Sequence, residues 1–160
     1  AKLRFKKNTK LFSLVFYLAP KDYHRFHSMA NCTVFERVHI GGLLYPVKDS
    51  YLEIVPGVYE VNERVTLKGE WKWGNLIQSY VGATNVGTIQ INLDPELNTR
   101  HTIDGPIVNN KLIGVDLQAG EEVGRFLMGS SVVAIVEVPN DFVWEVTVGQ
   151  DVKYGMRIGH

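Results

Sequence analysis

Short apolar stretches recur along the chain, and glycine, proline or asparagine separates them. Their length and their β-branched and aromatic content are typical of strands. They cover residues 11–18, 33–40, 64–69, 76–81, 87–93 and 132–138. The first is continuous enough to predict a buried strand ended by a proline, and residues 142–148 alternate like a further strand before a turn at 149–151. The pattern predicts a mainly β protein.

Helix signals are few. Residues 21–26 follow a proline and can form one short helical turn, and residues 49–59 can form a poor helix that Pro56 and Gly57 limit. Residues 97–114 have weak periodicity, which predicts a surface loop. Fifteen glycines and many short strands favour an antiparallel β-sandwich or partly closed barrel, a single domain with few short helices.

The composition is that of an ordinary globular domain, with 160 residues of which 45% are hydrophobic and 21% charged. A domain of this length can bury a core without disulfides or metals. Lys+Arg and Asp+Glu are both 17, and this zero net charge argues against a nucleic-acid partner. Cys32 is the only cysteine, so no intrachain disulfide can form, which fits a reducing compartment.

Membrane contact, if this chain makes any, is expected at the surface. The longest apolar stretch, residues 11–20, is broken by Ser13 and is too short to span a bilayer. No signal-peptide pattern is visible. Basic residues crowd the first ten positions, where they can form a solvated end or attract anionic headgroups. They are Lys2, Arg4, Lys6, Lys7 and Lys10.

His24 and His27 form the first candidate for chemistry, and three interpretations are open. Two histidines three apart can share one helical face and bind a metal, although no Cys or Glu cluster supplies further ligands. They can be structural residues whose ring nitrogens bind backbone groups. They can also act in acid–base catalysis, because imidazole titrates close to neutral pH.

Gly129, Ser130 and Ser131 form the second candidate, directly before an apolar strand. A Gly-Ser-Ser sequence is commonly a turn. It is not a nucleophile elbow, because the Gly-x-Ser-x-Gly pattern is absent. A hydroxyl can however be activated by an imidazole, and a preceding glycine permits backbone geometries that expose its carbonyl.

The order of four sequence blocks makes a family resemblance specific. Residues 17–27, Tyr-Leu-Ala-Pro-Lys-Asp-Tyr-His-Arg-Phe-His, resemble the histidine motif of phosphatidylserine decarboxylases. Residues 62–65 and 81–87 resemble two further blocks of that family. Residues 120–126 followed by 129–131 resemble its processing site. These blocks stand in the family's order from about residue 11 to the C-terminus.

The resemblance implies a self-processing enzyme that decarboxylates phosphatidylserine to phosphatidylethanolamine. His27 would take the proton of Ser130, whose oxygen attacks the carbonyl of Gly129 and splits the chain into residues 1–129 and 130–160. Ser130 would become a covalent pyruvoyl group that forms a Schiff base with the lipid's amine and accepts electrons as CO₂ leaves. His24 would assist decarboxylation by proton transfer, and Tyr17 would line the substrate pocket.

The family's processing triad also contains an aspartate in an Asp-Gly motif upstream of the histidines, which we expect to lie before this chain. Asp22 is not the matching position, and Asp104 with Gly105 stands in the wrong place in the order. An imidazole without its orienting carboxylate loses its preferred tautomer, which costs about 10⁴ in rate in an analogous triad. The sequence alone therefore predicts impaired self-processing for residues 1–160.

The implied partners are phosphatidylserine, a membrane surface touched peripherally, the chain's own two fragments and a second copy in a homodimer; no metal and no nucleic acid is expected. Resemblance of residues 69–72 and 81–87 to mitochondrial members favours the mitochondrial inner membrane over a bacterial cytoplasmic membrane. Apolar residues of one break-rich stretch can belong to the core or form an apolar rim that admits the lipid. They are Leu43, Leu44, Tyr45, Tyr51, Leu52, Ile54, Val55 and Val58.

Two other functions compete with this prediction. An inactive family member can serve as an interaction module, although the intact Gly-Ser-Ser and both histidines argue against it. The strand–turn–strand pattern of residues 142–159 also resembles the hairpins of a biotinyl or lipoyl carrier domain. A carrier needs a lysine at an exposed hairpin tip, and we expect Lys153 within a strand instead.

Overall fold

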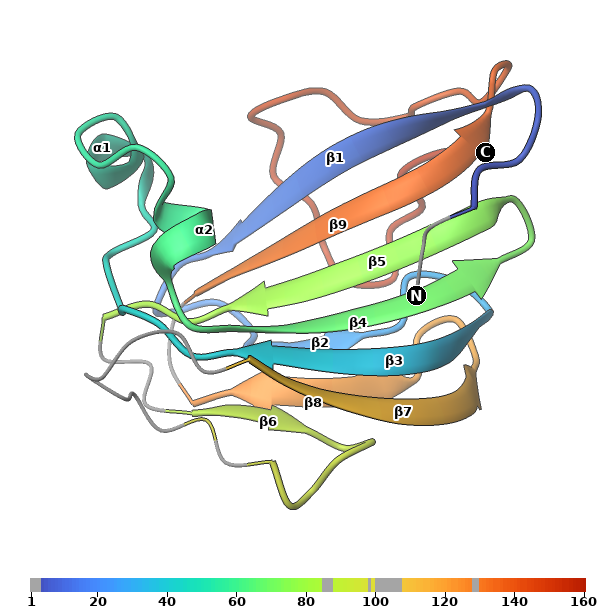
Figure 1. The fold of residues 1–160 in the computed structure, drawn as a ribbon. Helices are drawn as coiled ribbons and strands as arrows, with labels where there is room; N and C mark the ends of the chain where they lie inside the picture. The colour runs from blue at the N-terminus through green and yellow to red at the C-terminus, as the bar shows by residue number, and fades with distance from the viewer. Residues whose placement is uncertain (1–3, 85–87, 98, 100–107, 128–129) are drawn as a thin grey trace.

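Two antiparallel sheets pack face to face in the computed structural model, which describes residues 4–84, 88–97, 99, 108–127 and 130–160 (Figure 1). The large sheet has the order β1-β9-β5-β4-β3-β7, and the small sheet has the order β2-β8-β6. The strands of both sheets pair antiparallel. The prediction of a mainly β antiparallel sandwich is confirmed, and neither sheet closes into a barrel.

The strands of the large sheet are β1 (Thr9–Leu18), β9 (Ser130–Pro139), β5 (Gly74–Val81), β4 (Arg64–Trp71), β3 (Cys32–Ile40) and β7 (Val108–Leu117). The small sheet contains β2 (Arg25–His27), β8 (Glu122–Phe126) and β6 (Ile89–Ile91). Two short helices, α1 (Asp49–Leu52) and α2 (Val58–Val61), lie at the end of the large sheet where β1 and β5 finish (Figure 1). The single poor helix predicted over residues 49–59 is only partly confirmed, because helix is present at Asp49–Leu52 and again at Val58–Val61. Gly57 precedes α2 with a φ of 74°, a conformation that glycine adopts without strain.

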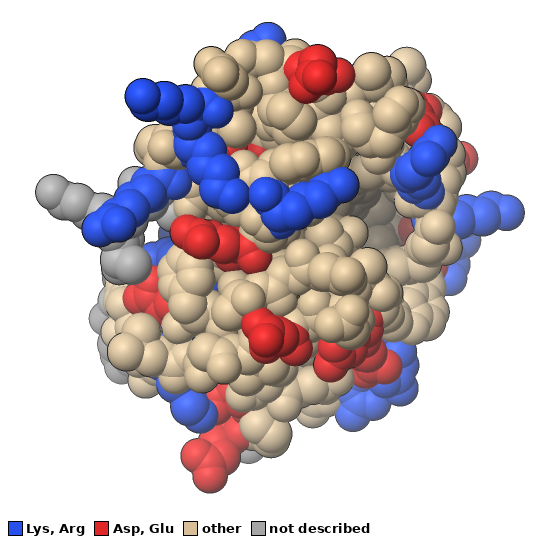
Figure 2. Space-filling view, turned by 90° about the vertical axis from the view of Figure 1, so that its right-hand side faces the viewer, with Lys and Arg blue, Asp and Glu red and all other residues tan. Residues whose placement is uncertain are grey.

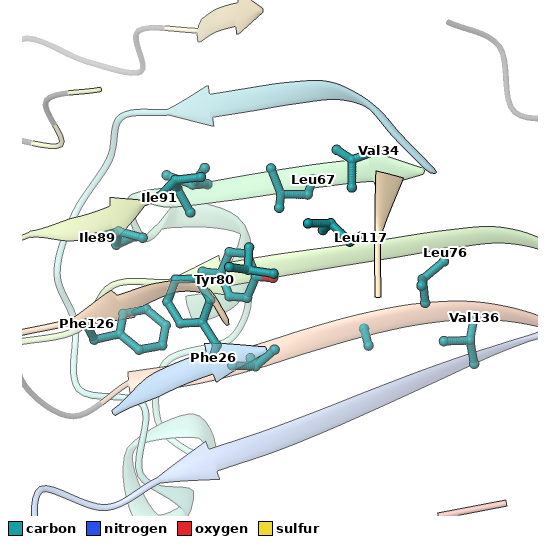
Figure 3. Close-up of a cluster of buried hydrophobic side chains, with 14 of the residues drawn as sticks. Phe26, Val34, Leu67, Leu76, Tyr80, Ile89, Ile91, Leu117, Phe126 and Val136 are labelled. Atoms are coloured by element: carbon teal, nitrogen blue, oxygen red, sulfur yellow. The ribbon is translucent and has the colours of Figure 1, made fainter. Parts of the chain in front are cut away.

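Aromatic rings join the two sheets. The ring of Phe26 in β2 stacks on that of Tyr80 in β5 with centroids 3.7 Å apart, and the ring of Phe126 in β8 meets Phe26 edge-on at 4.9 Å (Figure 3). Gly124 of β8 makes this packing possible, because a Cβ there would lie 2.7 Å from the Phe26 ring. Burying side chains of this size contributes about 1.5–3 kcal/mol each, so this cluster fixes the small sheet on the large one.

The strand at residues 11–18 is confirmed as part of β1, but its predicted burial is wrong. β1 is an edge strand that pairs only with β9. Leu11, Val15 and Tyr17 point to the outer face of the sheet and are exposed, as is Ser13. Phe12, Leu14 and Phe16 alternate with them and pack against the core. The continuous apolar run hid this alternation, because both faces of the strand carry apolar side chains.

Three other predictions about elements are wrong. Residues 108–114, predicted as loop, belong to β7; its side chains are mostly exposed, so the strand rests on backbone pairing to β3 and leaves no hydrophobic period. Residues 142–148 form no ladder, and only Trp144 makes a bridge, to Gly159. Residues 21–26 form no helix, because a turn at Pro20 leads into β2.

The far end of the large sheet is tied together by Glu137 of β9, which is fully buried. Its carboxylate accepts hydrogen bonds from the Lys6 amide at 2.6 Å, the Thr9 hydroxyl at 2.6 Å and the Asn75 amide at 2.9 Å. Burial opposes ionisation, yet these hydrogen bonds lower the pKa of Glu137 below its ordinary value. The carboxylate therefore holds the start of β1 and the start of β5 on one strand.

The surface at this end carries mixed charge (Figure 2). The Lys6 ammonium donates to the Lys72 carbonyl at 3.2 Å, and the Lys72 ammonium lies 3.7 Å from the centre of the Trp73 ring. Figure 2 shows Lys and Arg side chains and Asp and Glu side chains on the same face. Of the predicted basic cluster, Lys6 is folded against the β4–β5 turn.

Candidate active site

Ser130 begins β9 at the end of the large sheet where β1 and β5 finish (Figure 1). In the register, Ser130 lies opposite Leu18 of β1. The next residue, Ser131, lies between Tyr17 of β1 and Val81 of β5. The chain that follows the predicted cleavage bond is therefore part of a strand with a neighbour on each side.

Gly129 and the side chain of Ser130 lie outside the described residues, so the roles assigned to them remain predictions. Ser131 is fully buried, and its hydroxyl has no hydrogen-bond partner within the described part of the chain. Tyr17, predicted to line the substrate pocket, faces the same side of the sheet as Ser131 and is 43% exposed. The structure thus places Tyr17 beside the start of β9, on the open face.

A tight turn presents the histidine segment. The Asp22 amide donates to the Ala19 carbonyl at 2.8 Å, and the Asp22 carboxylate accepts from the Ala19 amide at 2.8 Å. The Asp22 side chain therefore closes the turn at the end of β1. The Asp22 carboxylate is used in this turn, and it is the Asp22 backbone carbonyl that meets an imidazole, that of His24.

His24 has one ring nitrogen bonded and one buried without a partner. Its Nδ1 hydrogen-bonds to the Asp22 carbonyl, which can only accept, so Nδ1 carries the proton. Its Nε2 is buried and has no partner among the described residues. A buried nitrogen with an unused lone pair is costly unless a ligand, a water or a reacting group meets it. Among the described residues, only one of the two ring nitrogens of His24 is therefore satisfied.

His27 lies in β2, where both of its ring nitrogens are bonded. Nδ1 lies 2.8 Å from the Gly120 carbonyl oxygen, and Nε2 lies 2.8 Å from the Tyr23 hydroxyl. The Tyr23 ring stacks on the imidazole with centroids 5.7 Å apart, and the Tyr154 ring meets it edge-on at 5.3 Å. The two histidines lie on a turn and a strand, so the helical face considered for them is wrong.

The small sheet brings the histidine segment to the chain that leads into β9. The Phe126 amide at the end of β8 donates to the His24 carbonyl at 2.9 Å. Four residues further along the chain comes Ser130, so at most about 14 Å of extended chain separates Phe126 from Ser130. His27 pairs with Glu122 at the other end of β8. The β8 residue that bonds His24 is thus nearer in sequence to the predicted cleavage site than the β8 residue that pairs with His27.

Phenols and a carboxylate surround these histidines. Burial and the neighbouring Tyr23 raise the pKa of Tyr154 to about 12, so its hydroxyl stays protonated. The hydrogen bond from Arg25 lowers the pKa of Glu122, the residue opposite His27. No group of three or more His, Cys, Asp or Glu that can hold a metal ion occurs among the described residues.

Asn62 connects the two sequence blocks that begin at residues 62 and 81. This residue is fully buried, and its side chain bonds the Tyr45 amide at 3.0 Å, the Tyr45 carbonyl at 2.8 Å and the Gly82 carbonyl at 2.9 Å. Next to it, the carboxylate of Glu63 lies 2.8 Å from Nε2 of the buried His39. These bonds fix the end of β5, which pairs with Ser131 of β9.

The apolar stretch near α1 and α2 divides between core and surface. Val58 is buried, and Leu52 and Val55 pack against the core from the edge. Leu43, Tyr45 and Ile54 are exposed; Ile54 is 74% exposed. No helix in the described part of the chain is long and apolar enough to cross a bilayer.

The sequence did not indicate three groups at the site, namely Gly120, Tyr23 and Tyr154. Tyr23 stands four residues before His27, a spacing that could have suggested a contact had the turn been predicted. Tyr154 comes from the C-terminal segment, and only the tertiary fold brings it to β2. Lys153, its neighbour, lies in no strand, contrary to the prediction; the Met156 amide bonds its carbonyl at 3.0 Å to close a turn.

Comparison with known proteins defines the class. The family model described as phosphatidylserine decarboxylase matches residues 2–160. The phosphatidylserine decarboxylase proenzyme of Plasmodium knowlesi is 42% identical over 159 residues, covering 95% of this chain and 45% of the relative. The mitochondrial phosphatidylserine decarboxylase proenzyme 1 of Saccharomyces cerevisiae is 40% identical over 164 residues, covering 95% of this chain and 33% of the relative.

The mitochondrial phosphatidylserine decarboxylase proenzyme of Pongo abelii is 37% identical over 162 residues, covering 96% of this chain and 40% of the relative. The chain belongs to the phosphatidylserine decarboxylase family. It spans 33–45% of the length of the three relatives named here. Membership of this family argues against the alternative of a biotinyl or lipoyl carrier domain.

Proposed function

We propose that this chain forms the catalytic part of a phosphatidylserine decarboxylase that makes its own pyruvoyl group at Gly129–Ser130. The observation that carries the proposal is the position of Ser130 at the start of β9, with the histidine segment bonded to the end of β8 just before it. The family match supplies the reaction: phosphatidylserine is converted to phosphatidylethanolamine and CO₂.

Self-cleavage begins at Ser130. His27 takes the hydroxyl proton, and the oxygen attacks the Gly129 carbonyl, so the amide bond is exchanged for an ester. Loss of the Cα proton of Ser130 expels the Gly129 carboxylate and leaves a dehydroalanine. Water then hydrolyses this group to a pyruvoyl group and ammonia. The products are residues 1–129, with a free carboxylate, and residues 130–160, with a blocked N-terminus.

Cleavage at this bond is compatible with the fold, because pairing with neighbouring strands holds β9 in place. β9 pairs with β1 on one side and with β5 on the other, and both of these strands stay in the larger fragment. The ladder with β1 alone extends from Thr9–Pro139 to Leu18–Ser130. Residues 130–160 therefore remain bound after cleavage as the second chain of one domain.

The pyruvoyl group, once formed, supplies a carbonyl that condenses with the substrate amine and accepts the electron pair released with CO₂. The start of β9 fits such a group, because neighbouring strands hold the backbone on both sides. Neutral His24 accepts a proton at Nε2 from the substrate ammonium as the amine condenses, and then transfers it to the carbon that loses CO₂. Its buried Nε2, which has no partner within the described residues, suits that task.

The site's surroundings support a lipid substrate reached from a membrane surface. Tyr17 is exposed beside the start of β9, and Leu43, Tyr45 and Ile54 are exposed near α1 and α2. These side chains form the apolar contact to the bilayer. The relatives from yeast and Pongo abelii carry mitochondrial names, and on that ground we place the protein at the mitochondrial inner membrane. A homodimer is part of the proposal, and light scattering of the purified protein would test it.

Intact mass spectrometry of the purified full-length protein tests the proposal. Two fragments separated at Gly129–Ser130 are expected, the smaller one beginning with a pyruvoyl group. Ser130→Ala, processed in parallel, should remain one chain. A wild-type protein that stays uncut at neutral pH would reject self-processing and favour the alternative of a non-catalytic interaction module of the same family.

A further inference from the structure

The two bonds to His27 define where its proton sits. The Gly120 carbonyl is an acceptor only, so the nitrogen 2.8 Å from it, Nδ1, must be protonated. In the neutral imidazole, Nε2 then carries the lone pair, and it accepts the hydrogen bond of the Tyr23 hydroxyl at 2.8 Å. The opposite tautomer would place the lone pair of Nδ1 against a carbonyl oxygen, which is repulsive.

The ring plane of His27 is fixed as well as its protonation. The Tyr23 ring lies nearly parallel to the imidazole, with an angle of 18° between the planes. The Tyr154 ring meets both of these rings edge-on, at 5.0 Å from Tyr23 and 5.3 Å from His27. Such aromatic contacts favour one ring orientation over rotation about χ2.

We propose that Tyr23 is a positioning residue that, together with the Gly120 carbonyl, keeps neutral His27 in the Nδ1–H form and leaves Nε2 as its basic atom. In a catalytic triad a carboxylate bonds one ring nitrogen so that the other one faces the reacting hydroxyl. Here the Gly120 carbonyl has the carboxylate's place at Nδ1, and the Tyr23 hydroxyl occupies the lone pair of Nε2 until the Ser130 hydroxyl replaces it. Here the contacts come from the fourth residue before the histidine and from the turn before β8. The proposal deepens the proposed function, since it concerns the base assigned to self-cleavage.

Tyr154 provides a matched control. Both tyrosines contact the His27 ring, but a hydrogen bond to an imidazole nitrogen is present for the Tyr23 hydroxyl and none is found for that of Tyr154 within the described structure. Changing either residue to phenylalanine keeps the ring contact and removes one hydroxyl. A difference between the two variants therefore reports the hydrogen bond and not the packing.

The direct test is ¹⁵N NMR of the histidine side chains in the full-length Ser130→Ala protein, which does not depend on cleavage. At a pH where His27 is neutral, its Nδ1 should show the shift of a protonated nitrogen and its Nε2 that of an unprotonated one. Adding Tyr23→Phe should lower the population of this tautomer, whereas adding Tyr154→Phe should leave it unchanged. An Nε2–H tautomer in the parent, or no response to Tyr23→Phe, would overturn the proposal.

The second test is the rate of self-cleavage in the full-length protein with Ser130 intact. Tyr23→Phe should speed the appearance of the two fragments about three- to tenfold, the usual worth of one hydrogen bond, because the Ser130 hydroxyl no longer has to displace the phenol from Nε2. Tyr154→Phe should stay within twofold of wild type. Equal rates for both variants would contradict the positioning role. If wild type itself is not cut, the proposed function fails, while the NMR result still decides the tautomer.

Discussion

The two ends of the large sheet differ in whether their buried polar groups have hydrogen-bond partners. At the far end, the buried carboxylate of Glu137 accepts hydrogen bonds from residues of three segments. At the near end, where Ser130 begins β9, the Nε2 of His24 and the hydroxyl of Ser131 are buried without a partner in the described structure. About 23 Å of strand separates Ser130 from Glu137.

The Glu137 end of β9 therefore contributes mainly to stability, and the Ser130 end lies at the site of the proposed reaction. A buried polar group that keeps its hydrogen bonds stabilises the fold, and one that lacks them costs free energy until something binds it. The far end is therefore expected to tolerate no loss of a partner. At the near end, Nε2 of His24 has no partner among the described residues and can meet a reacting group, so a change of His24 should affect activity before it affects folding.

The largest expected effect is that of Ser130→Ala, which should abolish cleavage because it removes the nucleophile. Ser131→Ala is the matched control, because it deletes a hydroxyl that has no partner in the described structure. It should cleave at a near-normal rate and remain as stable as wild type. Denaturing gels and intact mass report both results. Equal blockage by the two changes would mean that the nucleophile is the other serine.

The two histidines should differ in which step they serve. His27→Ala should stop cleavage, because it removes the base. His24→Ala should still cleave but lose about 10²–10⁴ in the rate of decarboxylation, the usual worth of acid–base catalysis. Fragment formation and CO₂ release, measured on the same samples, distinguish these steps. If His24→Ala blocks cleavage and His27→Ala does not, the roles are reversed, an outcome consistent with the closer anchoring of His24 to β9.

The substrate should distinguish the near end from a site for free amino acids. Processed full-length protein should release CO₂ from phosphatidylserine in mixed micelles at least about a hundredfold faster than from free serine, because binding of the acyl chains helps to place the amine. Hydroxylamine should inactivate the enzyme through its carbonyl, and a chelator should not. Comparable turnover of lipid and serine, or loss of activity on chelation, would reject the lipid, metal-independent mechanism.

At the far end, Glu137→Gln should lower the free energy of unfolding by about 1.5–3 kcal/mol, because hydrogen bonds to a charged acceptor are replaced by weaker ones. Glu70→Gln, an exposed residue of β4, is the control and should stay within about 0.5 kcal/mol of wild type. Urea denaturation of uncleaved Ser130→Ala protein gives both values. Equal stability of the two variants would remove the proposed contrast between the ends of the sheet.

The smallest effect concerns acid. The folded-state pKa of Glu137 is lowered, so its contribution to stability is present above its unfolded pKa of about 4.5. That contribution is lost as pH falls through the lower folded-state pKa. Stability of Ser130→Ala should therefore drop less steeply below pH 4.5 once Glu137→Gln is added. Parallel acid profiles for the two proteins would contradict this assignment.

Much of the fold was predictable because its strands carry local signals. The β-branched run before Pro139 predicted β9, and Pro56 with Gly57 predicted that helix near residues 49–59 would be poor. β2 and β8 were missed, because strands of three and five residues are too short for a period to be seen. β7 was missed because its side chains are mostly exposed, and a strand held by backbone pairing alone leaves no apolar pattern.

The sequence by itself determined the family, the mainly β fold and the candidate residues, since these rest on local spacing and on the order of short blocks. Only the tertiary structure decided the partners of each imidazole. Tyr154 is 127 residues from His27 in sequence and Gly120 is 93, and neither separation carries a periodic signal. The burial of Nε2 of His24 is likewise a property of the folded structure that no local pattern indicates. Local patterns choose the elements, whereas the environment of a titratable group depends on contacts that form between distant segments.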